Sequence, residues 1–288
     1  MTEHNETLEQ ARARNIRDAL AEDVGRGDWT ALLVPAAQRV RARVITREEA
    51  VLCGRDWFDG CVLALDPAAK IQWEGSDGSR MAAGSPLCFI ECNARALLTA
   101  ERSALNFVQM MSAVATVTRR HVDAIAGVSP NPRGCHILDT RKTLPGLRQA
   151  QKYAVRTGGG RNHRMALWDG ILIKENHIAA AGGIAQVLGQ ARALNAGVEI
   201  QIEVEGISQL REALEHGATA ILLDNFTPDM MREAVTVNAG RAELEVSGGV
   251  QLEQLRDIAA TGVDRISIGG LTKHVRAADL SMRVLERL

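Results

Sequence analysis

A series of short apolar segments in the second half of the chain constrains its fold more than any other feature. Six segments read as strands and alternate with segments that carry helix signals: 135–140, 170–174, 199–206, 220–226, 242–249 and 264–270. The last four recur about every 20 residues, which is the spacing of consecutive strand–helix units. With a seventh strand expected within 150–165, the pattern predicts a β/α barrel, complete or open on one side.

Helix boundaries in this half can be predicted from single residues. Thr227 and Pro228 are expected as the N-cap and the first residue of one helix, and Ser208 as the cap of a helix that ends at Gly217,. The triple glycine at 158–160 is interpreted as a flexible joint that could also approach a ligand closely.

The first part of the chain mixes helices and strands instead of alternating them. Helices are predicted over 6–22, over 56–65 with Asp56 as cap, and over 94–126, where two helices or one kinked helix would fit,. Strands are predicted over 40–46 and within 70–92,. This mixed order of helices and strands indicates a separate α+β layer.

The polarity of the strands in the second half alternates with a period of two. The polar residues of two strands share one face: Gln201, Glu203, Glu205, Glu243, Glu245 and Ser247,. Because helices cover the outer face of a barrel, these polar side chains are expected to point inward. Barrel interiors are usually apolar and buried carboxylates are costly, so this pattern indicates a functional site.

Basic residues concentrate between Arg141 and Lys174, where eight Lys or Arg stand against one acidic residue. Some of them read as an ordinary solvated helix face. Arg141, Lys142 and Lys174, however, follow predicted strands directly, at the end where barrel enzymes carry their active sites. His163 and Arg164 add further donors. Converging cations of this kind bind carboxylates or phosphates.

Two carboxylates, Glu203 and Asp224, are also expected at strand ends. They could pair with Lys142 and Lys174 in a structural network, or they could hold Mg²⁺ together with substrate oxygens and water. The two interpretations are compatible, because lysines can occupy the carboxylates until metal and diphosphate arrive.

Glycines end the last two predicted strands, as Ser247-Gly248-Gly249 and as Gly269-Gly270. Bare backbone N–H groups at this position of a barrel commonly hold a phosphate group. One such pair is an ordinary turn signal, but two pairs on adjacent strands favour phosphate binding.

Several classes of protein are disfavoured by composition. A net charge of −1 and an aromatic content of 3% argue against a nucleic-acid or membrane-surface protein,. No apolar run approaches the roughly 18 residues of a membrane span. The first residues lack a signal-peptide pattern, and the five cysteines form no C-x-x-C pair,. We therefore expect a cytoplasmic protein with reduced core thiols.

The combined site points to a reaction class. The basic residues would bind a carboxylated molecule, the two carboxylates would bind Mg²⁺, and the glycine pairs would bind a phosphate monoester. The chain lacks a P-loop and the Rossmann glycine pattern, and no strand carries a Ser or Cys nucleophile with a His partner,. Transfer between a phosphorylated sugar and an anionic acceptor fits best.

Specific stretches along nearly the whole chain resemble the quinolinate phosphoribosyltransferase family. The most specific are LDTRKTLPGLR (138–148), GGGRNHR (158–164) and ILIKENH (171–177), with EDVGRGDWT (22–30), ERSALNF (101–107) and SIGGLT (267–272) in the same order. One departure follows SIGGLT, where the family continues with His-Ser and this chain has Lys273-His274. The role of these two positions is therefore left open.

The resemblance implies an N-terminal α/β sandwich domain over 1–114, joined by 275–288, and an open, seven-stranded type of β/α barrel over 115–274. It implies a homodimer with shared active sites, in which Arg102 reaches the quinolinate bound by the partner subunit. Catalytic roles are implied for Lys142, Glu203 and Asp224, the last two facing the ribose and Mg²⁺. The quinolinate pocket would be lined by Thr140, Arg141, His163, Arg164 and Lys174. The 5′-phosphate would be held by Ser247, Gly248, Gly249, Gly269 and Gly270.

The implied reaction joins quinolinate to phosphoribosyl diphosphate and yields nicotinate mononucleotide, diphosphate and carbon dioxide, a step in NAD synthesis. Three alternatives remain. One is a phosphoribosyltransferase for a monocarboxylate such as nicotinate, and another is a barrel paralogue associated with molybdenum uptake. The third is a non-catalytic sensor of a phosphorylated ligand, which would bind without releasing diphosphate.

Overall fold

In a computed structural model, which describes residues 5–288, the chain divides into two compact units. The first contains the residues up to Arg119 together with 143–159 and 271–288, and the second contains 120–142 and 160–270. An α/β fold with a parallel sheet and a separate N-terminal part confirms the predicted fold class. The domain boundaries after residues 114 and 274 stay a prediction.

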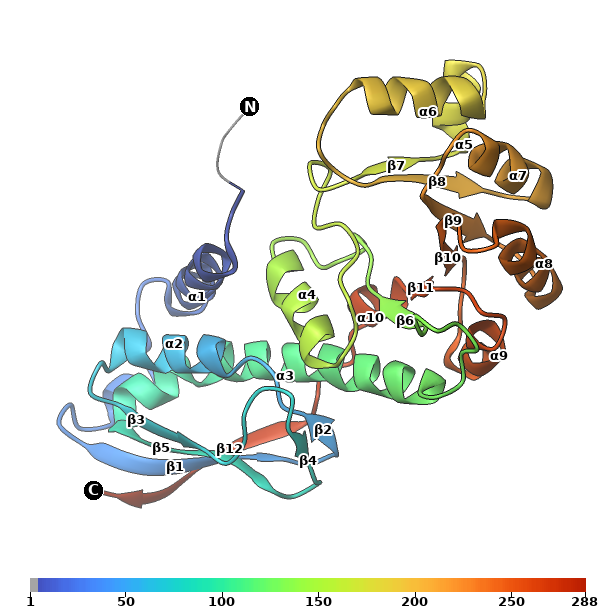
Figure 1. Cartoon of the computed structure of the whole chain (residues 1–288). Coiled ribbons are helices and arrows are strands. Elements are labelled where there is room, and N and C mark those ends of the chain that lie inside the picture. Colours follow the sequence, from blue (N-terminus) through green and yellow to red (C-terminus); the bar gives the residue numbers. More distant parts are fainter. Residues whose placement is uncertain (1–4) are drawn as a thin grey trace. The chain divides into compact units, whose positions relative to one another are not determined.

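The first unit is built on an antiparallel sheet with the strand order β12-β1-β5-β3 (Figure 1). Its elements are α1 (Leu8–Val24), β1 (Arg39–Thr46), β2 (Ala50–Val51), α2 (Arg55–Leu65), β3 (Lys70–Trp73), β4 (Arg80–Met81), β5 (Pro86–Asn93), α3 (Ala94–Ile125), α4 (Arg148–Thr157), α10 (Gly270–Lys273) and β12 (Leu280–Arg287). Alternate residues of β1 are buried, as the period-two pattern of 40–46 predicts. The C-terminal β12 pairs with β1, so the first and last strands of the described residues lie side by side in one sheet.

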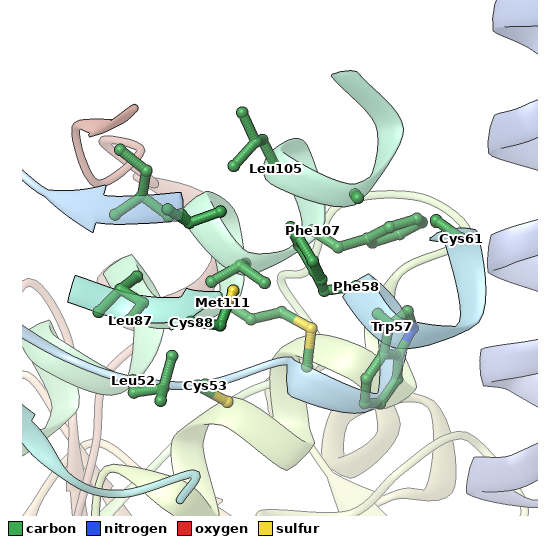
Figure 2. Close-up of a cluster of buried hydrophobic side chains, with 14 of the residues drawn as sticks. Leu52, Cys53, Trp57, Phe58, Cys61, Leu87, Cys88, Leu105, Phe107 and Met111 are labelled. Carbon is green, nitrogen blue, oxygen red and sulfur yellow. The ribbon is translucent and has the colours of Figure 1, made fainter. Parts of the chain in front are cut away.

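The core of the first unit lies between this sheet and the helices α2 and α3. Figure 2 shows Trp57 and Phe58 of α2 packed with Met111 of α3 and Cys88 of β5. Asp56 was predicted to cap α2, and this prediction is wrong. The helix begins after Gly54, and Asp56 lies in its first turn. A carboxylate from a loop, Asp77, accepts the N–H groups of Gly54 and Arg55 at 3.0 and 3.3 Å.

The predicted segment 94–126 forms one continuous helix, α3. Gly158, which follows α4, packs closely against this helix, and the flexible joint predicted for 158–160 stays a prediction. A Cβ atom at Gly158 would lie 2.5 Å from the carbonyl oxygen of Ala115 and 2.7 Å from Cβ of Thr118. No larger residue fits there without displacing backbone.

The second unit is a sheet of parallel strands covered by helices (Figure 1). Its elements are β6 (His136–Leu138), β7 (Ile171–Ile173), α5 (Glu175–Ala181), α6 (Ile184–Ala193), β8 (Ile200–Val204), α7 (Ile207–Glu215), β9 (Ala220–Asp224), α8 (Pro228–Asn238), β10 (Glu243–Ser247), α9 (Leu255–Ala259) and β11 (Arg265–Ser267). All six predicted strands are present, in the order β6-β11-β10-β9-β8-β7. Arg161 adds a parallel bridge to Leu138, within the segment where a seventh strand was expected.

Two helix caps in this unit test the local predictions. Thr227 caps α8 by accepting the N–H of Met230 and is followed by Pro228, as predicted. The prediction for Ser208 is wrong, because α7 begins after Gly206 and Ser208 lies in its first turn. Gly206 is the N-cap residue with an extended backbone, and no side chain caps the helix there.

The polar faces of the strands point to the same side of the sheet. Gln201 on β8 donates from Nε2 to Oε2 of Glu245 on β10 at 3.0 Å, across the intervening strand β9. Only side chains on one face can meet in this way, which confirms the shared face predicted for both. Glu205 differs, since it lies beyond the last residue of β8 and is exposed.

Within residues 5–288 no helix is long and apolar enough to cross a membrane. The cytoplasmic location stays a prediction.

Candidate active site

The carboxyl ends of the parallel strands bring most of the predicted site residues to one edge of the second unit. Thr140, Arg141 and Lys142 follow β6, Lys174 follows β7, Glu203 is the fourth of five residues in β8, and Asp224 and Ser247 end β9 and β10. The register pairs Ser247 with Asp224, and it pairs Glu203 with Leu222, two residues before Asp224. Arg102 belongs to the first unit, where it is exposed on α3.

Lys174 and Glu203 form an ion pair at this edge. The Nζ atom of Lys174 lies 2.7 Å from Oε2 of Glu203, and the carboxylate side chain is only 11% exposed while the lysine is 46% exposed. The pairing predicted for these residues is therefore present. A mostly buried carboxylate thus faces a cation that solvent and ligands can reach.

Arg141 and Arg164 place two positive charges close to each other. Burial, and then the charge of Arg141, lower the pKa of Arg164 from its ordinary value,. The guanidinium of Arg164 is held by the carbonyl oxygen of Gly170, to which Nη1 donates at 2.7 Å. Two half-buried guanidinium groups that repel each other are stabilised when an anion binds between them, so this pair is suited to an anionic ligand.

Lys142 lies along Gly269, which precedes α10. The N–H of Lys142 donates to Oγ1 of Thr140 at 3.1 Å, and a Cβ atom at Gly269 would lie 3.0 Å from Cδ of Lys142. The same Cβ atom would lie 3.4 Å from Oγ1 of Thr140. Glycine at position 269 therefore leaves room for the side chains that follow β6.

Asp224 is oriented by a neighbour that the sequence analysis did not select. Asn225 adopts a left-handed backbone with φ 56° and donates from Nδ2 to Oδ2 of Asp224 at 2.7 Å. Its Oδ1 lies where a side chain at Gly248 would be, because a Cβ atom there would approach it to 2.5 Å. Gly248 and Gly249 both have positive φ, which presents their backbone to solvent beside Asp224,.

His163 lies next to the cation pair and is held on both sides. Its backbone N–H donates to Oδ1 of the buried Asp139 at 2.9 Å. Its Nδ1 accepts the backbone N–H of Arg164 at 2.7 Å, and its Nε2 lies 3.0 Å from Oε1 of Gln201. Nε2 is also 3.5 Å from Oε1 of Glu245.

Four residues at this site were not selected from the sequence: Asp139, Gln201, Asn225 and Glu245. Gln201 and Glu245 carried a signal, since their strand phase placed them on the inward face with Glu203 and Ser247. Asp139 sits in the specific motif at 138–148, but nothing in its spacing marks it as the partner of His163. Contacts between residues so distant in sequence appear only once the chain is folded.

Glu203 and Asp224 are the two carboxylates at this edge that could hold a metal ion. No group of three His, Cys, Asp or Glu side chains that could hold a metal occurs among residues 5–288. Mg²⁺ needs no such group, because it is commonly bound by one or two carboxylates together with substrate phosphates and water. The pair Glu203 and Asp224 fits this second kind of site.

Comparison with known families covers almost the whole chain. The family described as quinolinate phosphoribosyl transferase, N-terminal domain, matches residues 28–112, and the corresponding C-terminal domain family matches residues 114–283.

Individual relatives agree with this match. The nicotinate-nucleotide pyrophosphorylase [carboxylating] of Mycobacterium leprae is 42% identical over 277 residues, which cover 93% of this chain and 95% of the relative. A probable enzyme of the same name from Bacillus subtilis is 39% identical over 264 residues, covering 91% and 90%. The structure of the nicotinate-nucleotide pyrophosphorylase from Francisella tularensis superimposes with a TM-score of 0.92 at 42% identity and covers 98% of this chain and 100% of that one.

Proposed function

The chain belongs to the quinolinate phosphoribosyltransferase family, and from that premise we propose that it transfers the phosphoribosyl group of phosphoribosyl diphosphate to quinolinate. The products are nicotinate mononucleotide, diphosphate and carbon dioxide, so the enzyme serves NAD synthesis. The observation that carries the proposal is the pair of neighbouring guanidinium groups of Arg141, which follows β6, and Arg164, which lies in the loop before β7 and is held there by the carbonyl oxygen of Gly170. Two clustered cations suit an acceptor with two adjacent carboxylates better than a monocarboxylate.

Quinolinate binds at the cationic side of the strand edge. Arg141, Arg164 and Lys174 take its carboxylates, and Thr140 and His163 line the same pocket. Lys174 is pre-positioned by its pair with Glu203, 2.7 Å away, and remains partly exposed toward a ligand. Arg102 is supplied by a second copy of the chain in a homodimer.

The phosphorylated sugar binds at the other strands. Backbone N–H groups of Gly248 and Gly249, which have positive φ, hold the 5′-phosphate together with Ser247, Gly269 and Gly270,. Glu203 and Asp224 face the ribose and would hold Mg²⁺. When bound, the metal ion disperses the negative charge of the diphosphate group.

The residues of the chain act mainly by orientation and fixed charge. The ring nitrogen of quinolinate is a weak nucleophile, so the sugar carbon develops oxocarbenium character as its bond to diphosphate breaks. Glu203 and Asp224 stabilise that positive charge, while Lys142 lies near the reacting atoms. The new bond to the ring nitrogen makes the ring cationic. The carbon–carboxylate bond then breaks, carbon dioxide leaves, and the electron pair left on the ring carbon takes up a proton.

An assay of diphosphate release with quinolinate, phosphoribosyl diphosphate and Mg²⁺ tests this function. We expect release only when all three are present, and nicotinate mononucleotide as the product. Faster turnover with nicotinate would assign a monocarboxylate acceptor instead. Binding of the sugar diphosphate without any release would contradict an enzymatic role, and release without added Mg²⁺ after chelation would remove the metal from the proposal.

A further inference from the structure

The proposed reaction does not use one carboxylate that lies inside the sheet. Glu245 is in the middle of β10 and is 0% exposed. Its Oε2 accepts one hydrogen bond, from Gln201. Its Oε1 accepts no hydrogen bond from the described residues, although Nε2 of His163 lies 3.5 Å away. A buried carboxylate is costly unless it is paired, so a side chain that is retained in this state needs an explanation.

A chain of three hydrogen bonds connects Glu245 to the backbone of Arg164. The backbone N–H of Arg164 can only donate, so Nδ1 of His163 must accept at 2.7 Å and carries no proton,. The ring proton is then on Nε2, which donates to Oε1 of Gln201 at 3.0 Å. Gln201 in turn donates from Nε2 to Oε2 of Glu245 at 3.0 Å. The N–H of Arg164, which can only donate, and the carboxylate of Glu245, which can only accept, fix the direction of all three hydrogen bonds.

These hydrogen bonds occupy both ring nitrogens of His163 with protein partners. The imidazole, whose side chain is 13% exposed, therefore holds the backbone at Arg164 and is not a free donor toward a ligand. Asp139 fixes the same segment from the other side through the backbone N–H of His163. Arg164 then extends from a backbone that is held at two consecutive residues.

We propose that Glu245 is a positioning residue for the acceptor site: through Gln201 and His163 it sets the place of Arg164, and thereby the affinity for a dicarboxylate. The inference rests on the proposed function in that Arg164 is taken to bind a carboxylate of quinolinate. Glu245 itself lies below the site and does not touch the substrate. A displacement of the guanidinium by about 1 Å lowers catalytic efficiency by about 10- to 100-fold.

Glu245→Met and Glu245→Gln separate positioning from a role in stability. Methionine removes the hydrogen bond between Gln201 and Glu245. We expect the KM for quinolinate to rise about 10-fold or more, while the KM for phosphoribosyl diphosphate stays within about twofold. The melting temperature should fall modestly, because methionine leaves the buried Nε2 group of Gln201 without its acceptor,. Glutamine can still accept from Gln201, so it should restore the KM for quinolinate to within about threefold of the native value.

The state of His163 gives a readout that needs no activity. In protein with ¹⁵N-labelled histidine, the His163 signals, assigned by their loss in His163→Gln, should show a proton on Nε2 in the native enzyme and in Glu245→Gln. In Glu245→Met the amide of Gln201 loses the bond that holds its orientation and can turn to present an N–H to Nε2 of His163. This donor competes with the N–H of Arg164, so the signals should shift toward a mixture of the two tautomers. If native enzyme releases no diphosphate, the proposed function fails, and these signals still decide whether Glu245 controls the imidazole.

Two further variants complete the test. Glu243→Gln changes a carboxylate on the same face of the same strand that pairs with Arg265, and it should leave both KM values unchanged. If Glu245→Met does not fold, the double variant with Gln201→Met removes both buried polar partners, and we expect the same rise in the KM for quinolinate. An unchanged KM for quinolinate, unchanged His163 signals, or equal increases in both KM values would overturn the inference.

Discussion

Lys174 and Glu203 meet across neighbouring strands, with Nζ of the lysine 2.7 Å from Oε2 of the glutamate. The lysine is about half exposed and the glutamate is mostly buried. An ion pair with an exposed partner contributes little to stability, about 0–1 kcal/mol. The pair is therefore better explained as a charge arrangement held ready for substrates than as a structural support.

Replacement of Lys174 should affect activity far more than stability. For Lys174→Ala we expect kcat/KM to fall about 100-fold or more, because a charge that binds a carboxylate is lost. The free energy of unfolding should change by less than about 1 kcal/mol. Arg211→Ala breaks an exposed pair with Glu233 on other helices and serves as the matched control, with native activity. A large stability loss in Lys174→Ala with modest loss of activity would contradict this expectation.

Arg141→Ala and Lys142→Ala should lose catalysis while the fold survives. Both residues follow β6, and Arg141 neighbours Arg164. We expect losses in kcat/KM of about 100-fold or more, seen mainly in the KM for quinolinate for Arg141 and mainly in kcat for Lys142. Steady-state kinetics and circular dichroism check both statements. Full activity of either variant, with Mg²⁺ and both substrates present, would remove that residue from the site.

Subunit mixing tests whether Arg102 acts across a homodimer. Arg102→Ala and Lys174→Ala should each be nearly inactive alone, because each removes one cation from every site. In a mixed dimer one site combines the intact Lys174 of one chain with the intact Arg102 of the other. We expect mixing after partial unfolding and refolding to restore up to about a quarter of native activity, as random pairing of two variants allows. No recovery in dimers whose mixed composition is verified by mass would speak against the shared site.

Gly248→Ala should weaken the phosphate site. Position 248 has φ 104°, and an added Cβ atom would lie 2.5 Å from Oδ1 of Asn225, the residue that orients Asp224. We expect a loss of about 1–2 kcal/mol in stability and a higher KM for phosphoribosyl diphosphate.

The matched control for this substitution is Gly189→Ala. Gly189 lies on the exposed face of helix α6, and a Cβ atom there would meet nothing within 4 Å. Alanine should stabilise this helix by about 0.5–1 kcal/mol and leave both KM values unchanged. Equal changes in stability and in both KM values for the two variants would show that the phosphate site does not depend on the backbone conformation at Gly248.

Asp59 should make stability depend on pH. Burial raises its pKa from 3.8 to about 6, although Nε1–H of Trp73 donates to it at 2.9 Å. The folded state therefore binds the proton more tightly than the unfolded state. The favourable contribution of the protonated form is present below about pH 4 and is lost as the pH rises through about 6.

Asp59→Asn tests this linkage, because asparagine resembles the protonated acid and can still accept from Trp73. In urea titrations the variant should exceed the native protein by about 1 kcal/mol at pH 8, a value reduced for remaining solvent contact. Near pH 4 the two proteins should have equal free energies of unfolding. A difference that is the same at both pH values would rule out the titration of Asp59 as its cause.

Much of the fold could be predicted because its signals are local. Strand segments were correct for β6 to β11, since short apolar runs between glycines and helix caps have few other solutions,. The cap at Thr227 was correct for the same reason. Predictions failed where a distant residue replaced the local signal, as when Asp77 took the place of Asp56 at the start of α2.

For the site, the sequence by itself determined which residues stand at strand ends and which polar residues share the inward face, because strand phase and strand ends are properties of the local chain. Only the tertiary structure decided which of them meet. Glu245, Gln201 and His163 lie tens of residues apart, and their hydrogen bonds exist because strands β8 and β10 flank β9 in one parallel sheet. Strand order arises from packing of the whole sheet, and the polarity pattern of a single strand does not specify which strands become its neighbours.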